Sequence, residues 1–282
     1  MKKNIILTAI LLVFFSGVSF AATVGGETDM TLPESSFFSR DSAIREALDS
    51  YETPVAMKAG FDVEFLSKKE LNTATDVTKA KIEGQNVNFK FSMNYSDVLE
   101  PYIKVGTSNL KVKWEQRGDS VTVEAQPGLV YAGGLKAKLW EFASTGIKLT
   151  LDGQYKNTQL DVDKAMIGGS STVASATSTA FDIKDYQVSL LASKKFIFPM
   201  GVQDCYTVPY MGLTWSDSEV NVHFTQSTTG GIYSTYDASN KNTWGVVLGI
   251  DIIPSLLSWY LFSFELRLVD ETAFSISGTM KF

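Results

Sequence analysis

The chain has 282 residues, a formal net charge of −6 and 44% hydrophobic residues. The mild acidity excludes a basic surface for nucleic acid, and a mean hydropathy of +0.02 excludes a bundle of membrane-spanning helices. Cys205 is the only cysteine, so the chain can form neither an intrachain disulfide nor a cysteine-based metal site. No cofactor is expected, because the sequence has no phosphate-binding glycine loop, metal-ligand cluster or nucleotide fingerprint.

The N-terminus has the pattern of an export signal. Lys2 and Lys3 are followed by a short apolar run and by small residues that place a cleavage site between Ala21 and Ala22. The run is too short to span a bilayer comfortably, and no cysteine follows it, which excludes a lipid-anchored lipoprotein. No later apolar run approaches the ~20 residues of a spanning helix. Residues 1–21 are therefore predicted to be a signal peptide, and the exported protein to be either soluble or a β-barrel.

A polar segment without periodicity follows the cleavage site, and a short amphipathic helix is predicted near its end. Apolar residues recur at helical spacing over residues 41–51. Two placements of this helix are open: at the periplasmic mouth of a barrel, or inside the barrel as a small plug. We interpret residues 22–53 as a periplasmic N-terminal segment.

From residue 54 the period of the hydrophobic pattern changes to two. Over residues 57–65, five apolar side chains alternate with lysine, glycine, aspartate and glutamate, and similar alternation recurs over 87–95, 147–155 and 244–252. Successive side chains of a β-strand point to opposite faces, so one face of this sheet is apolar and the other carries full charges. A soluble β-sandwich also alternates, so this pattern alone does not decide between the two folds.

The length and number of the strands favour a membrane barrel. Several exceed the usual ~5–6 residues and are long enough to cross a membrane at a tilt. About ten strands are expected, an even number that places both termini on the periplasmic side. The predicted strands are 54–67, 79–95, 101–116, 121–141, 144–160, 179–195, 205–224, 241–254, 257–270 and 273–282.

The connections between these strands differ in length on the two sides, as in bacterial membrane barrels. Long outer loops rich in Ser, Thr and Gly are predicted over 161–179 and 226–240. On the opposite side three of four connections are short. The predicted periplasmic connections are Ser96–Pro101, Phe142–Gly146, Phe196–Tyr206 and Pro254–Leu257.

A weak internal echo follows two of the periplasmic connections. Glu100-Pro-Tyr102 and Val208-Pro-Tyr210 begin two similar strands. Proline at the first position of a strand removes no hydrogen-bond donor that the ladder needs. The echo indicates a shared architecture in the two parts of the sheet.

The C-terminal strand carries a resemblance to a known class. Phe274, Ile276, Met280 and Phe282 share one face, and polar residues occupy the other. This strand resembles the terminal strand of bacterial outer-membrane β-barrel proteins of the porin-like superfamily, which end on an aromatic residue. The resemblance implies that these four residues are read by the barrel-assembly machinery, although Met280 replaces the family's aromatic at that position. It further implies a single antiparallel transmembrane β-barrel over 54–282 that contacts outer-membrane lipid and lipopolysaccharide.

In such a barrel the face opposite the lipid lines the interior. Basic residues dominate this expected set, which would give an open path a mild anion preference. Two interpretations are open: a network of ion pairs that fills a narrow barrel, and a narrow water-filled passage for small solutes. The predicted interior residues are Lys58, Asp62, Glu64, Lys90, Lys104, Lys136, Lys138, Lys148, Asp152, Lys156, Asp251, Glu265, Arg267 and Lys281.

The favoured function is therefore that of a structural barrel or narrow passive channel without enzymatic activity. One alternative is a surface adhesin acting through the outer loops, where Arg117-Gly118-Asp119 spells a short adhesion tripeptide.

A second alternative is a barrel hydrolase. His223 is the only histidine, and Asp217 and Glu219 lie close to it in the sequence. A histidine near a carboxylate suits general-base chemistry, but no matching motif surrounds it.

Overall fold

The computed structural model describes residues 55–282 except 74–76, 117, 168–169, 174–179, 201–202, 227–231 and 255–258. The signal peptide, the cleavage position at Ala21 and Ala22, and the helix predicted over 41–51 lie outside the described residues. The strands are β1 Val55–Asn72, β2 Val77–Tyr95, β3 Leu99–Gln116, β4 Asp119–Ala125, β5 Gly128–Phe142, β6 Ile147–Leu160, β7 Val162–Ile167, β8 Ser170–Val173, β9 Ala180–Lys194, β10 Phe196–Met200, β11 Gln203–Gln226, β12 Ile232–Asn240, β13 Trp244–Ile253, β14 Tyr260–Leu268 and β15 Glu271–Lys281.

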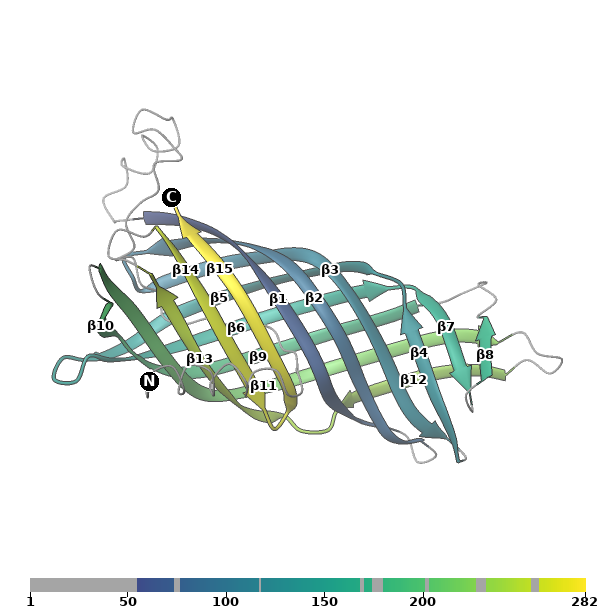
Figure 1. Ribbon diagram of the computed structural model, residues 1–282. Helices are drawn as coiled ribbons and strands as arrows, with labels where there is room; N and C mark the ends of the chain where they lie inside the picture. The colour runs from purple at the N-terminus through teal and green to yellow at the C-terminus, as the bar shows by residue number, and fades with distance from the viewer. Residues whose placement is uncertain are drawn as a thin grey trace, which may run out of the picture.

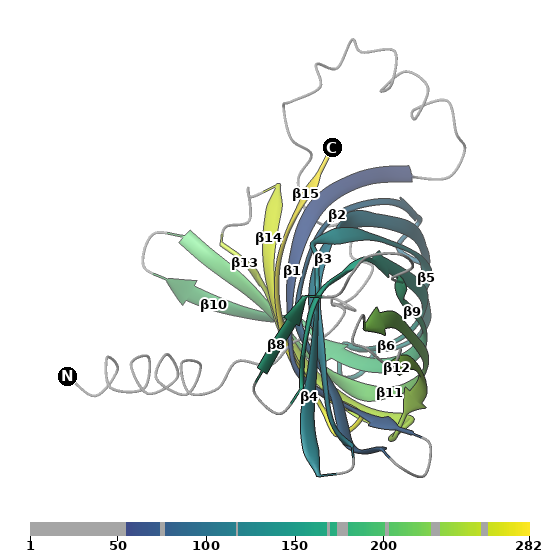
Figure 2. The ribbon, with the colours of Figure 1, turned by 90° about the vertical axis from the view of Figure 1, so that its right-hand side faces the viewer.

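Ten of these strands form a closed antiparallel barrel (Figure 1). Each strand of the ring pairs with the next in the order β1, β2, β3, β5, β6, β9, β11, β13, β14 and β15. The ring closes where β15 pairs with β1, from Lys58 opposite Lys281 to Lys69 opposite Glu271. Figure 2, seen from the end opposite the C-terminus, shows the strands wrapped around one axis. The prediction of a single antiparallel barrel of about ten strands is confirmed.

The outer wall carries an apolar belt where the two faces of each strand differ most. On β2, Val87, Phe89 and Phe91 are exposed, whereas their neighbours Asn86 and Asn88 are buried. Exposed apolar side chains are stable against lipid and not against water, so this belt defines the membrane section of the barrel. No helix in the described part of the chain is long and apolar enough to span a bilayer. Exposed members of the belt include Phe61, Val87, Phe89, Phe91, Ile103, Val105, Leu129, Leu135, Val188, Leu190, Met211, Leu213, Leu248 and Phe262.

A charge placed in the middle of this belt should be costly. Phe91 lies near the centre of the belt on β2, and 55% of its surface is exposed. We expect Phe91→Lys to lower the free energy of unfolding from a bilayer by about 2–4 kcal/mol, because the ammonium must enter hydrocarbon. Urea titration of the protein in lipid vesicles measures this change. As a control, Gln85→Lys on the same strand but beyond the belt should stay within about 0.5 kcal/mol. Equal stability of the two variants would mean that the belt does not face lipid.

Beyond the belt, at the end opposite the C-terminus, several strands continue into what we call the outer extension. It comprises the distal ends of β1, β2, β3, β9 and β11 together with β4, β7, β8 and β12 (Figure 1). Here the polarity of the two faces is inverted. Along the inward face of β9, Phe181 and Ile183 are apolar, whereas Asp185, Gln187 and Ser189 in the membrane section are polar. Water replaces lipid outside the extension, so its apolar side chains turn inward.

The outer extension corrects three predictions. The strand predicted over 121–141 is two strands, because β4 leaves the barrel wall and pairs with β7. The loops predicted over 161–179 and 226–240 contain β7, β8 and β12. Their Ser, Thr and Gly content indicated loops, but pairing with β4 and β11 and burial of Val162 and Ala165 stabilise them as strands.

The end of the barrel where β15 finishes, which was predicted to be periplasmic, has tight turns and one protruding hairpin. The connection between β2 and β3 is the three residues 96–98, in which Ser96 and Asp97 both adopt positive φ and the Val98 N–H donates a 2.9 Å hydrogen bond to the Tyr95 carbonyl. The predicted connection Phe196–Tyr206 is not a plain loop, since β10 pairs with β11 and continues the line of β9 after a break at Lys195. Phe196 and Phe198 are exposed on this hairpin. The connection predicted over Pro254–Leu257 lies largely outside the described residues.

Candidate functional site in the barrel interior

The interior of the membrane section is polar and densely occupied. Ten of the fourteen predicted interior residues are buried, and Lys90 and Lys156 are largely so. Lys138 and Lys148 lie near the turn between β5 and β6, where Lys138 forms an ion pair with the exposed Glu141 at 3.7 Å. The buried ten are Lys58, Asp62, Glu64, Lys104, Lys136, Asp152, Asp251, Glu265, Arg267 and Lys281.

In the half of the barrel nearer Lys281, lysines and carboxylates from β1, β2 and β3 form short ion pairs. The Lys58 Nζ lies 3.0 Å from Glu100 Oε2, and Lys90 Nζ lies 3.4 Å from Glu100 Oε1. Lys104 Nζ lies 2.8 Å from Asp62 Oδ2, and both of these side chains are buried. Each buried charge here has an oppositely charged neighbour, which offsets the cost of removing it from water.

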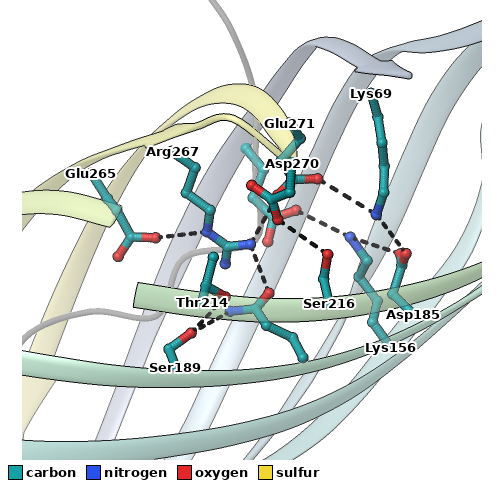
Figure 3. A network of polar contacts seen from close by, with 12 residues as sticks. Lys69, Lys156, Asp185, Ser189, Thr214, Ser216, Glu265, Arg267, Asp270 and Glu271 are labelled. Atoms are coloured by element: carbon teal, nitrogen blue, oxygen red, sulfur yellow. Dashed lines mark hydrogen bonds and ion pairs between the residues drawn. The ribbon is translucent and has the colours of Figure 1, made fainter. Parts of the chain in front are cut away.

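Closer to the outer extension, Arg267 on β14 is the centre of a second network (Figure 3). Its guanidinium lies 2.9 Å from Glu271 and 3.4 Å from Glu265, and it donates a 2.6 Å hydrogen bond to Gln187 on β9. Arg267 is 1% exposed, so these partners replace the water that would otherwise stabilise its charge. The network ties β14 and β15 to the opposite wall of the barrel.

The same network continues through Asp185 on β9. The Lys69 Nζ lies 2.9 Å from Asp185 Oδ1, and the Lys156 Nζ lies 3.4 Å from Asp185 Oδ2 (Figure 3). The Ser218 hydroxyl donates a further 2.5 Å hydrogen bond to Asp185. Lys69 also lies 3.6 Å from Glu271, which links this group to Arg267. Side chains from five strands thus meet across the interior.

The two tyrosines of the internal sequence echo, Tyr102 and Tyr210, are buried and make equivalent contacts in the structure. Tyr102 on β3 stands opposite Gly134 on β5, and its hydroxyl donates a 3.0 Å hydrogen bond to Asp152 on β6. Tyr210 on β11 stands opposite Gly249 on β13, and its hydroxyl donates a 2.9 Å hydrogen bond to Glu265 on β14.

In both cases the tyrosine ring covers the glycine. A Cβ at Gly134 or Gly249 would overlap the ring of its tyrosine. The same arrangement therefore occurs twice in the wall. In each case the tyrosine ring crosses the neighbouring strand at a glycine, and its hydroxyl reaches a carboxylate on the strand after it.

The balance of charge in the interior differs from the prediction. The expected dominance of basic residues is wrong for the described residues, because acidic partners accompany them. The fully buried charged residues are six basic, Lys58, Lys69, Lys104, Lys136, Arg267 and Lys281, and eight acidic, Asp62, Glu64, Glu100, Asp152, Asp251, Glu265, Asp270 and Glu271. An interior of this composition gives no reason for an anion preference.

Three of these partners lie outside the predicted strands, because the strands are longer than predicted. Lys69 lies beyond the predicted end of the first strand, Glu100 lies one residue before the predicted third strand, and Glu271 lies in a predicted turn. Asp185 falls within a predicted strand, and its alternation with the outward Tyr186 could have identified it.

Little space remains between the side chains of the second network. One cavity among Glu64, Lys69 and Asp185 has a volume of about 20 Å³, and another beside Arg267 and Gln187 has a volume of about 10 Å³. Each has room for about one water molecule at most.

A continuous apolar cluster lies directly beyond this network, inside the outer extension. Its members come from several strands of the barrel, including Ile82, Val112 and Trp114 on β2 and β3, Phe181 on β9 and Val222 on β11. All five are buried. Among the residues that the structure describes, ion pairs occupy the interior of the membrane section and packed hydrocarbon lies beyond it.

The residues of the hydrolase alternative lie on β11 near its outer end. The backbone of His223 pairs with Ala180 on β9 and with Thr235 on β12. Asp217 and Glu219 are exposed on the outer wall. Among the described residues, no group of three or more His, Cys, Asp and Glu residues is placed to hold a metal ion.

The four residues of the predicted assembly signal lie on or next to β15, the strand that closes the barrel. Phe274, Ile276 and Met280 alternate with buried Ser275 and Ser277, and the backbone N–H of the following Phe282 donates to Met57. Their recognition by the assembly machinery stays a prediction.

Comparison with known proteins gives distant structural similarities. No protein-family model and no curated protein sequence matches the chain. The translocator domain of the autotransporter NalP from Neisseria meningitidis matches with a TM-score of 0.37 and 9% identity over 85% of this chain and 92% of that one. The transport unit of the autotransporter AIDA-I from Escherichia coli matches with a TM-score of 0.35 and 8% identity over 83% and 90% of the two chains. These similarities are distant and indicate no shared activity.

Proposed function

We propose that this chain is an integral β-barrel of the bacterial outer membrane that is closed at rest and serves a structural role without enzymatic activity. The observation that supports this proposal most strongly is the interior, where ion pairs from opposite walls meet and an apolar cluster covers their outer end. Even numbers of strands, short turns beside the termini and a lipid-facing apolar belt are features of outer-membrane barrels.

The size of the barrel supports a closed state. Barrels of about eight strands are nearly filled by side chains, whereas open porins have about sixteen, and ten strands form this wall. A solute that entered the membrane section would have to separate pairs such as Lys69 and Asp185, which lie 2.9 Å apart. Each separated charge would then remain buried without a partner, which is costly.

The apolar cluster of the outer extension adds a second barrier. An ion that passed the network would lose its hydration between side chains such as Val112, Phe181 and Val222, which are 0% exposed. Narrow hydrophobic constrictions stop ion flow because water does not fill them. The two barriers are in series along the barrel axis.

A planar-bilayer recording of the refolded mature protein tests this proposal. We expect no steady conductance steps, while an open porin in the same bilayer gives its ordinary steps. Folding is checked beforehand by the resistance of the barrel to detergent without heating. Stable steps of uniform size from the folded protein would contradict a closed barrel and favour the narrow passive channel.

The outer extension favours a second role, that of a surface adhesin. The outer extension is an ordered part of the sheet with its own apolar core. Strands β3 and β4 meet at its tip in a tight turn, where Gly118 has a φ of 87°. Asp119 begins β4 directly after this turn. Adhesion through this turn predicts that Asp119→Ala lowers the binding of protein-bearing vesicles to host cells. Unchanged binding by this variant would exclude the turn as the adhesive site.

A further inference from the structure

The outer wall has a polar hollow where the sheet divides. Strand β3 pairs with β5 as far as Ser108 opposite Gly128, and from Lys111 opposite Glu124 it pairs with β4 instead. The hollow between the two branches has a volume of about 510 Å³. We call it the fork cleft, and the polar residues that line it are Asn109, Lys111, Glu124, Gln126 and Asp163.

The fork cleft lies just beyond the apolar belt. Val105 on β3 and Leu129 on β5 are 48% and 50% exposed and are the last apolar side chains of the belt on these strands. Asn109 follows Val105 by four residues, which is about 13 Å along a strand and about 10 Å along the membrane normal for an ordinary strand tilt. A lipid whose chains contact Val105 and Leu129 would therefore place its headgroup at the cleft.

Positive charge is concentrated beside the cleft. Lys81, Lys111 and Lys113, which we call the lysine trio, surround the single carboxylate of Glu83 with N–O distances of 2.7, 3.6 and 2.7 Å. Lys81 stands directly opposite Lys113 in the ladder, a like-charge pair that destabilises a sheet unless an anion is near. Two further lysines of this face are paired with carboxylates: Lys164 with Glu124 at 2.9 Å, and Lys79 with Glu115 at 3.0 Å.

Glu83 does not neutralise the lysine trio. Burial alone would raise the pKa of Glu83, but hydrogen bonds and positive charge from Lys113 and Lys81 lower it to about 2. Glu83 is therefore ionised at neutral pH, and the group of three ammonium ions and one carboxylate carries an excess of positive charge. The trio remains about one-third exposed and can reach a ligand.

We propose that the fork cleft and the lysine trio bind the phosphorylated sugar headgroup of a glycolipid in the outer leaflet. The lysines would pair with phosphate oxygens, since charge-assisted hydrogen bonds are the strong ones. The amides of Asn109 and Gln126 and the carboxylates of Glu124 and Asp163 suit sugar hydroxyls, which both donate and accept. This inference rests on the proposed outer-membrane location, because that leaflet is where such a lipid would meet the cleft.

The test measures binding of a diphosphorylated lipid A to the mature protein in detergent micelles by native mass spectrometry. We expect the double variant Lys111→Gln/Lys113→Gln to bind at least about tenfold more weakly, because two charge-assisted bonds are lost. The matched control is Lys184→Gln on β9, which removes a 43% exposed lysine paired with Glu219 away from the cleft. Equal binding by the double variant and the parent, or equal weakening by the control, would overturn the proposal.

Further probes separate the class of ligand. Dephosphorylated lipid A should bind weakly to every variant, and Asn109→Ala/Gln126→Ala should weaken lipid A but not phosphatidylglycerol, which has a phosphate without the disaccharide. A glycolipid site would be overturned if the parent protein bound phosphatidylglycerol as tightly as lipid A. It would also be overturned if inorganic phosphate alone displaced lipid A at equal concentration. Bilayer recordings on the same preparations keep the two proposals apart. A silent barrel that does not bind lipid A contradicts only this inference, and a conducting barrel that binds it contradicts only the closed state.

Discussion

Replacing Arg267 with methionine is expected to lower the free energy of unfolding by about 3–5 kcal/mol. The guanidinium lies within 3.4 Å of two buried carboxylates, Glu265 and Glu271. Methionine has a similar length but no charge, so both carboxylates would stay buried without their shared partner. It also leaves the carbonyl oxygen of Gln187 without its 2.6 Å donor.

Urea unfolding of the refolded protein in lipid vesicles, followed by tryptophan fluorescence, measures this loss. The matched control is Lys241→Met, which breaks the 2.9 Å pair with Glu70 at the surface. Exposed pairs contribute about 0–1 kcal/mol, so the control should unfold near the parent. A loss at Arg267 no larger than at Lys241 would show that the interior is well hydrated, which would also weaken the case for a closed barrel.

A second variant tests whether the loss at Arg267 comes from the stranded carboxylates. The triple variant Arg267→Met/Glu265→Gln/Glu271→Gln removes the charges together. Neutral amides are cheaper to bury than carboxylates, so we expect this variant to recover part of the lost stability. Further destabilisation in the triple variant would mean that the arginine acts through packing.

Adding a methyl group at Gly249 is expected to destabilise the barrel by about 1–3 kcal/mol. The Cβ of alanine would overlap the ring of Tyr210, which is buried and held at its hydroxyl by Glu265. The ring must therefore move and strain or break its 2.9 Å hydrogen bond. Gly134→Ala should act in the same way on Tyr102 and its bond to Asp152.

Gly153 on β6 supplies the control for the glycine prediction, because a Cβ there would meet no atom within 4 Å. Gly153→Ala should change the free energy of unfolding by less than about 0.5 kcal/mol. A double-mutant cycle of Gly249→Ala with Tyr210→Ala isolates the steric contact. We expect the glycine substitution to cost much less once the ring is gone, since interacting residues are not additive. Equal costs in both backgrounds would exclude the proposed contact.

The sequence by itself determined the fold class and most of the wall. A period of two is a local property, so it assigns residues such as Phe89 and Asn88 to opposite faces without knowledge of their neighbours. The number of strands in the barrel wall followed from the same pattern. The echo of Tyr102 and Tyr210 was visible too, but the glycines and carboxylates that explain it lie on other strands.

Only the tertiary structure decided what the interior contains. Lys69 and Asp185 are 116 residues apart in the chain, and Arg267 and Gln187 are 80 apart. Which strands stand opposite each other, and at what height, depends on the closure and register of the whole barrel. The pairing of buried acidic with buried basic residues, the apolar cluster in the outer extension and the fork cleft arise from that geometry. The sequence pattern therefore assigns each side chain to the inside or the outside, while its partner there is fixed only by the closed sheet.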